Sequence, residues 1–301
     1  MSTRTKGLWM VLIASTLWGV SGTAAQVLFQ EKEMTADGLV VIRMLVAGIL
    51  LLLMAAWKGI SLLAIWRKRE SRLRLLLFSI FGMLGVQYTY FASIETGNAA
   101  TATLLQYLAP VYIVVYSLMK EKRKPSKPIW FAVGFALIGT FLLLTNGAIE
   151  GLSVSFISFI WGILSGIALA FYTLTSAALL KNWSSFIVVG WGMVIGGGVM
   201  GLFSSSWLKP SAEWGLDTFL LIIFVIVFGT LLAFLLFIES IRHLSPTESS
   251  ILSSFEPLSA VITSIVFLHV SFGFFQAIGG VLIILTVFVL SKGNRSSSEI
   301  L

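Results

Sequence analysis

Long apolar runs constrain this chain more than any other feature. Leu39 to Trp57, Phe219 to Ile238 and Val281 to Leu290 are examples, each bounded by charged or turn residues. The mean hydropathy is +0.98 and 11% of the residues are charged, against about one quarter in ordinary globular proteins. Such a chain would not be soluble in water as a monomer, so the sequence predicts an integral membrane protein.

The lengths of these runs predict helices. A bilayer core of roughly 30 Å needs about 20 apolar residues per helix. The runs are about twice as long as a barrel strand and lack its alternating pattern. We therefore expect an all-α protein with ten transmembrane helices, over roughly 7–29, 38–57, 73–94, 98–119, 128–146, 153–179, 184–204, 216–239, 247–268 and 272–291.

The basic residues indicate the orientation. If the N-terminus is cytoplasmic, nearly all of the 20 lysines and arginines fall in cytoplasmic loops. Lys32 and Lys209 fall outside, and Arg43 lies within a span. The positive-inside rule then predicts that both termini are cytoplasmic in a multi-pass protein of the cell membrane. The basic clusters are topology signals on this interpretation, so we expect no nucleic-acid partner.

Other chemistry has little support in the sequence. There are no cysteines and only two histidines, His243 and His269, which lack partners at metal-ligand spacing. No phosphate-binding Walker loop appears either. We therefore expect neither a metal nor a cofactor, and no catalytic residue.

The chain also repeats itself. Gly85 and the segment 94–96 match Gly229 and the segment 238–240 at a constant offset of 144 residues. After a three-residue insertion, Pro110 aligns with Pro257. The predicted units are 7–146 and 153–291, followed by a cytoplasmic tail, 292–301. Because five helices is an odd number, the second unit would be inverted in the membrane, as in many secondary transporters. Shared composition of polytopic halves is the alternative explanation.

Several short motifs follow one another in a specific order: Trp18-Gly19, Arg43, the segment 98–102 leading to Pro110, and Glu256-Pro257. Together they resemble the EamA family of the bacterial drug/metabolite transporter superfamily. The resemblance covers about residues 7–290 and implies alternating-access transport of small metabolites that differ between members. The family often has a Gly-Glu pair at the ends of spans 4 and 9. At these two places this sequence has Lys120-Glu121 and Leu268-His269, which leaves the role of His269 open.

Two ionisable residues inside spans are candidates for coupling. Glu256 lies about ten residues into its span, or roughly 15 Å deep, and Arg43 about six residues, or roughly 9 Å. If the two form a pair, a movement that separates them would couple proton binding to transport. Alternatively, Arg43 snorkels toward Asp37 and Glu33, and Glu256 accepts bonds from helix ends opened by Pro257.

Polar and aromatic side chains in the spans predict a substrate cavity, since apolar walls with a few polar groups are typical of small-molecule sites. Interhelical hydrogen bonding is the alternative for these groups. Pro110 and Pro257 are the candidates for helix breaks that free backbone carbonyls. The cavity candidates are Trp18, Gln26, Gln87, Tyr90, Asn98, Gln106, Tyr107, Trp161, Tyr172, Ser253 and Glu256.

The sequence therefore predicts a secondary transporter, and specifically an exporter, that moves a small metabolite such as an amino acid or amphiphilic amine by alternating access. Protons are the candidate coupling ion. The lipid bilayer and a small-molecule substrate are the expected partners, and the oligomeric state is open. A membrane-embedded enzyme and a non-transporting membrane sensor are the alternatives.

Overall fold

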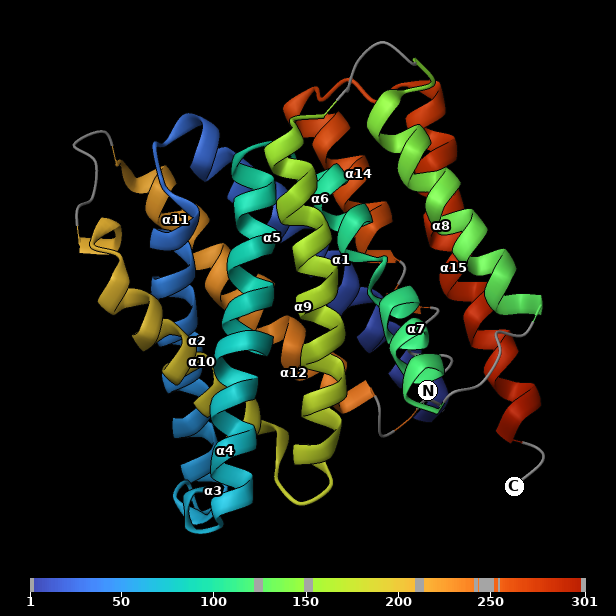
Figure 1. The fold of residues 1–301 in the computed structure, drawn as a ribbon. Coiled ribbons are helices and arrows are strands. Elements are labelled where there is room, and N and C mark those ends of the chain that lie inside the picture. The colour runs from blue at the N-terminus through green and yellow to red at the C-terminus, as the bar shows by residue number, and fades with distance from the viewer. Residues whose placement is uncertain are drawn as a thin grey trace.

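The computed structural model describes residues 3–121, 127–148, 154–208, 214–240, 243, 252–253 and 255–298. Every regular element among these residues is helical, and no strand occurs among them (Figure 1). The elements are α1 (Thr3–Glu31), α2 (Ala36–Trp57), α3 (Ala64–Arg67), α4 (Arg69–Leu77), η1 (Phe78–Leu84), α5 (Gly85–Glu95), α6 (Ala99–Gln106), α7 (Ala109–Glu121), α8 (Lys127–Thr145), α9 (Phe156–Leu180), α10 (Ser185–Phe203), η2 (Ser206–Leu208), α11 (Leu216–Ile226), η3 (Val227–Leu232), α12 (Ala233–Ser240), α14 (Phe255–Leu268) and α15 (Phe274–Ser298).

Seven helical segments of the described residues are long and apolar enough to cross a membrane. Three shorter apolar helices, Ile129–Thr145, Phe255–Leu268 and Phe274–Thr286, accompany them. These segments fall where the sequence predicts its ten spans, and they confirm the all-helical membrane architecture. The first part of the predicted span 247–268 lies outside the described residues, apart from 252–253.

Polar caps explain where two of the helices begin. The Thr35 hydroxyl accepts a hydrogen bond from the Gly38 amide at 3.3 Å at the start of α2. The Asn98 side chain accepts one from the Thr101 amide at 2.8 Å at the start of α6. Each side chain satisfies a backbone donor that has no partner in the first helical turn.

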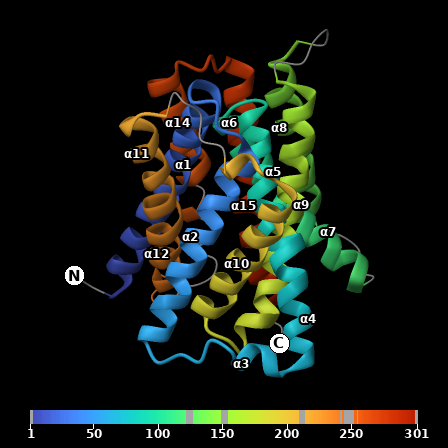
Figure 2. The same cartoon turned by 90° about the vertical axis from the view of Figure 1, so that its left-hand side faces the viewer.

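Helix pairing follows a regular scheme. α1 packs against α12 and α14, while α9 packs against α5 and α6. α2 pairs with α10, and α8 pairs with α15 at one side of the bundle (Figure 1). Both termini and the α3–α4 segment lie toward the same end of the molecule (Figures 1 and 2).

Three places within the described spans depart from regular α-helix. η1 lies between α4 and α5, and η3 lies between α11 and α12; both are π-helical segments inside a span. The third is a two-residue turn, Tyr107–Leu108, that separates α6 from α7. π-Helical turns are rare in proteins as a whole, and those that occur are often found at functional sites. The residues around these segments are therefore candidates for a functional site.

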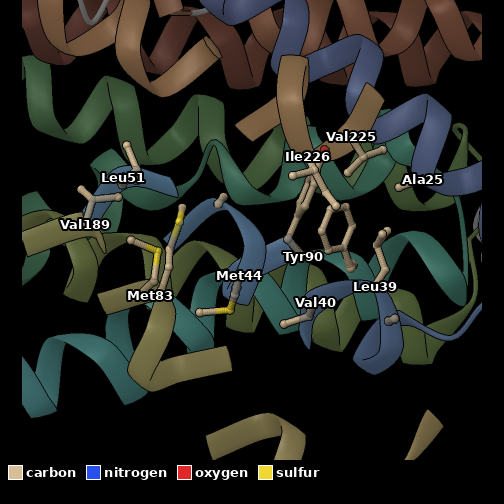
Figure 3. Close-up of a cluster of buried hydrophobic side chains, with 14 of the residues drawn as sticks. Ala25, Leu39, Val40, Met44, Leu51, Met83, Tyr90, Val189, Val225 and Ile226 are labelled. Atoms are coloured by element: carbon tan, nitrogen blue, oxygen red, sulfur yellow. The ribbon is translucent and has the colours of Figure 1, made fainter. Parts of the chain in front are cut away.

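The larger apolar core lies between α1, α2, η1, α5, α10 and α11. Leu39, Met44, Met83, Val189 and Val225 are buried in it (Figure 3). Tyr90 also belongs to this cluster, next to Val225 and Ile226 in the close-up. A second cluster joins α6 to α8 and α15 through Leu104, Leu105, Leu143 and Ile283.

Close approach of α8 and α15 depends on glycine. A Cβ on Gly139 would lie 2.8 Å from the Gly279 carbonyl oxygen and 3.1 Å from the Leu282 Cβ. By contrast, a Cβ on Gly134, on the same helix, would meet nothing within 4 Å in the described structure. Small residues at such crossings let two backbones pack directly against each other within a membrane.

This difference predicts the effect of two matched substitutions. Gly139→Val should destabilise the fold by about 1–3 kcal/mol, because the added methyl groups push α8 away from α15. Gly134→Val should change the stability by much less. Thermal unfolding of the two purified variants in detergent measures the difference, and equal melting temperatures would contradict the assigned helix contact.

Candidate functional site

Arg43 lies two turns into α2, where its side chain is 5% exposed. Its Nε donates a hydrogen bond to the Thr230 hydroxyl at 2.6 Å, and its Nη2 donates to the Gly229 carbonyl at 3.5 Å. The guanidinium carbon also lies 4.8 Å from the centre of the Phe91 ring. The charge is thus held by a hydroxyl, a carbonyl and an aromatic face within the bundle.

The π-helical segment η3 supplies both oxygens. Thr230 donates its own hydroxyl proton to the Val225 carbonyl, five residues earlier, at 2.9 Å. That bond orients the hydroxyl so that its lone pairs are available to Arg43. Thr230 has no surface exposure, so this acceptor is built into the interior.

Glu256 lies in the first turn of α14 and is half-buried. The Tyr107 hydroxyl approaches its Oε2 at 3.3 Å and also bonds the Ser253 carbonyl. Tyr107 is the first residue of the turn between α6 and α7. A side chain from this break in one span therefore reaches the carboxylate at the start of another.

Small residues of α1 allow the neighbouring helices to close around this region. A Cβ on Gly22 would lie 2.6 Å from the Tyr90 hydroxyl, and one on Gly19 would lie 2.7 Å from the Ala260 amide. The Tyr90 hydroxyl in turn lies 2.8 Å from the Thr103 hydroxyl. α1 thus contacts α5 on one side and α14 on the other through glycines.

Glu256 lies close enough to interact electrostatically with Arg43, Tyr90 and Tyr107, and Tyr90 also interacts with Arg43 and Tyr107. Among the described residues, however, no ion pair joins Arg43 to Glu256. No ion pair joins Arg43 to Asp37 among these residues either, and the Asp37 carboxylate accepts hydrogen bonds from Ser204 and Ser206. The two charges are held apart, each by its own neighbours.

Other candidate residues make contacts between helices. The Gln26 side chain accepts a hydrogen bond from the Ala99 amide at 2.9 Å, next to the Asn98 cap of α6. Gln106 donates to the Ser165 hydroxyl at 2.7 Å. Gln26 thus joins α1 to α6 and Gln106 joins α6 to α9, as interhelical hydrogen bonds do in membrane proteins, while Asn98 caps its own helix.

The aromatic candidates pack on other rings. Trp18 lies 5.2 Å from both Phe234 and Phe237, and its indole nitrogen is buried without a hydrogen-bond partner among the described residues. Trp161 packs edge-on against Tyr88 at 5.5 Å. Tyr172 packs against Phe78 of η1 at 5.1 Å, and Gln87 is buried within α5.

The two prolines both lie near the start of a helix. Pro110 is the second residue of α7, and Pro257 is the third residue of α14. A proline is tolerated in the first helical turn because its missing donor would have no intrahelical partner there. His269 occupies the loop after α14 with φ of 51°, and His243 is separate from this region in the sequence.

Sequence reasoning missed Thr230 as the partner of Arg43. A signal for it exists, because Thr230 is the one hydroxyl residue in the apolar run from Phe219 to Ile238. Phe91 follows the cavity candidate Tyr90 in the sequence. Its position under the Arg43 guanidinium depends on the packing of α2 against α5, which the sequence does not show.

Removing the Thr230 hydroxyl should destabilise the protein. Thr230→Val keeps the side-chain volume but leaves a buried guanidinium without its shortest hydrogen bond, at a cost of about 1.5–3 kcal/mol. Thr173→Val on α9 is the matched control, because that exposed hydroxyl bonds only to the Leu169 carbonyl. Thermal unfolding in detergent compares them; a melting temperature for Thr230→Val equal to that of the control would contradict this role.

Comparison with known proteins identifies the chain. The sequence profile of the EamA-like transporter family matches residues 5–145 and again residues 156–292. An uncharacterized inner membrane transporter of Salmonella typhimurium, YicL, is 36% identical over 297 residues, which is 98% of each chain. An uncharacterized transporter of Bacillus subtilis, YwfM, is 25% identical over 295 residues, covering 95% of this chain and 93% of the relative.

A solved crystal structure resembles the fold over 97% of this chain and 99% of its own, with a TM-score of 0.65 and 16% identity. That likeness concerns the arrangement of helices alone. The two matches of the family profile and the Salmonella relative show the family. The chain is therefore a multi-pass membrane transporter and belongs to the EamA-like transporter family.

Proposed function

We propose that the chain is a secondary transporter that exports a small metabolite, such as an amino acid or amphiphilic amine, across the cytoplasmic membrane by alternating access coupled to protons. The observation that carries this proposal is a pair of crosswise contacts. Arg43, in the first half of the chain, bonds Thr230 in the second, and Tyr107, in the first half, contacts Glu256 in the second.

The two halves, residues 7–146 and 153–291, are on this proposal inverted five-helix repeats. The family profile matches each half separately, which supports a duplication. The helix pairing also supports it: α1 contacts α12 and α14 as α9 contacts α5 and α6. In inverted repeats of secondary transporters, the substrate site lies near the midplane between the repeats.

The proposed orientation has both termini in the cytoplasm. The termini lie toward the same end as the α3–α4 segment (Figure 1). That segment and its flanks contain Lys58, Arg67, Lys68, Arg69 and Arg72. Basic residues concentrate on the cytoplasmic side of inner-membrane proteins, which supports this orientation and an even number of spans.

Alternating access requires the two halves to move, and the crosswise contacts lie where they meet. A charge within the membrane is costly unless it is paired or solvated. A substrate ammonium would compensate the Glu256 carboxylate, and a proton would neutralise it, so one carboxylate cannot hold both. Exchange of a proton for a substrate cation at Glu256 would then couple proton entry to export.

Arg43 would contribute a positive charge opposite the Glu256 carboxylate, in the same part of the bundle interior. A guanidinium presents five donors, of which two make hydrogen bonds to η3 in the described structure. A substrate with both an ammonium and a carboxyl group could interact with Glu256 and Arg43 together. An amphiphilic amine would use Glu256 and the aromatic side chains, so both substrate classes remain within the proposal.

Transport in liposomes tests the proposal. Purified protein should accumulate part of a pooled metabolite mixture, followed by mass spectrometry, only when a pH gradient is imposed. In Glu256→Gln, gradient-driven accumulation should fall to the level of protein-free liposomes, because an amide cannot exchange a proton.

Glu70→Gln is the matched control, since the Glu70 carboxylate pairs with Arg74 at 2.6 Å in an exposed position on α4. This control should transport like the wild-type protein. Transport by Glu256→Gln that remains dependent on the pH gradient would refute coupling at this residue. Failure of the wild-type protein to move any metabolite under either direction of the gradient would count against export itself.

A further inference from the structure

A cavity of about 290 Å³ lies apart from the charged residues of the bundle interior. It is formed where the α1–α2 loop meets the turn after α10. None of the predicted site residues lines it. Its lining residues are Glu33, Met34, Thr35, Gly38, Ser205, Ser206, Trp207 and Trp214.

Two tryptophans of the lining are held in place by their indole nitrogens. Trp207 donates to the carbonyls of Ser204 and Gly201, at 3.1 and 3.4 Å. Trp214 donates to the Lys32 carbonyl at 2.9 Å and packs edge-on against Phe219. Since both N–H groups are used, the rings can offer a ligand only their π systems, which attract cations.

The acidic groups that the structure describes at the cavity also favour a cation. Glu33 is part of the lining, and Asp37 lies behind it, bonded to Ser204 and Ser206. The Lys32 ammonium pairs with Asp217 at 2.5 Å, which compensates its positive charge. An ammonium group in the cavity would therefore meet tryptophan rings and a carboxylate.

The backbone at Glu33 is unfavourable for a glutamate. Its φ is 53°, in the left-handed region, where glycine and asparagine are the residues that fit most easily. Such strain lowers stability, and it is found where a side chain has a functional use. A glycine at this position would relieve the strain but would remove the carboxylate, so stability and binding should change in opposite directions.

We propose that this cavity binds an organic cation, with its ammonium group beside the indole rings of Trp207 and Trp214 and the Glu33 carboxylate as counter-charge. The volume is close to the lower end of small-molecule sites, about 300 Å³, so a single small amine fits it best. The site is independent of the proposed transport mechanism, because it uses none of the residues assigned to it.

Equilibrium binding to the purified full-length protein in detergent tests the site. Isothermal titration with tetramethylammonium, at constant ionic strength, should show saturable binding. Glu33→Gln and Trp214→Leu should each weaken it roughly tenfold or more, as expected for loss of a charge partner or an aromatic face. Glu33→Gly should weaken binding by at least as much while raising the melting temperature, because it also relieves the backbone strain.

Trp57→Leu is the matched control, because Trp57 is 94% exposed at the far end of α2. It should leave binding unchanged. Absence of saturable binding to the wild-type protein would overturn the proposal. So would binding that survives both Glu33→Gln and Trp214→Leu, or sodium ions that compete as well as tetramethylammonium.

Choline and phosphocholine distinguish two sources of the same ammonium chemistry. A site for free amines should bind choline at least as tightly as phosphocholine, whereas a site for lipid headgroups should prefer phosphocholine. If the tighter binding of either compound is lost in Glu33→Gln, the result supports the ammonium site. The compound that binds more tightly then shows whether the site takes free amines or lipid headgroups. Binding of neither compound would contradict the proposal.

Discussion

The rest of the structure depends on one constraint: within hydrocarbon, every backbone donor and acceptor needs a partner inside the protein. Helices meet that need locally, which is why the described spans are helical almost throughout. The backbone can depart from the α-helix only where other groups form hydrogen bonds with its free donors and acceptors. Within the spans that the structure describes, the departures are η1, η3 and the Tyr107–Leu108 turn, and two of them contact the interior charges.

This arrangement links the two charges to the relative position of the halves. η3 receives Arg43 through Thr230 and Gly229, and the turn after α6 places Tyr107 against Glu256. Neither charge is neutralised by the other at ion-pair distance in the described structure. A rigid-body movement between the halves would change both contacts together, which is what a transporter needs if the state of the carboxylate is to control opening.

Much of the fold follows from the sequence, because apolar length and helix caps are local properties. The start of α6 follows from Asn98, and the start of α2 from Thr35, both as ordinary caps. Glu256 and Arg43 stand out because charged residues are rare in apolar runs. The positions of the helices also follow, since the bilayer sets their length.

The remaining features depend on packing between distant segments. Of the two alternatives that the sequence offers for Arg43, snorkelling toward Asp37 and Glu33 differs from the structure, where Arg43 donates to a hydroxyl and a carbonyl of η3. Nothing in the run from Phe219 to Ile238 predicts a π-helical segment, and the cavity beside Trp207 and Trp214 requires two loops far apart in the chain. These features could not be predicted from one segment at a time.

Alternating access at the interior charges can be measured directly, because the sequence contains no cysteine. Thr103→Cys introduces a single thiol beside Tyr90, and a membrane-impermeant thiol reagent can be applied from either side of oriented vesicles. Labelling should occur from one side under one pH gradient and shift to the other side when the gradient is reversed. Labelling from both sides at once, or an unchanged side under both gradients, would contradict alternating access.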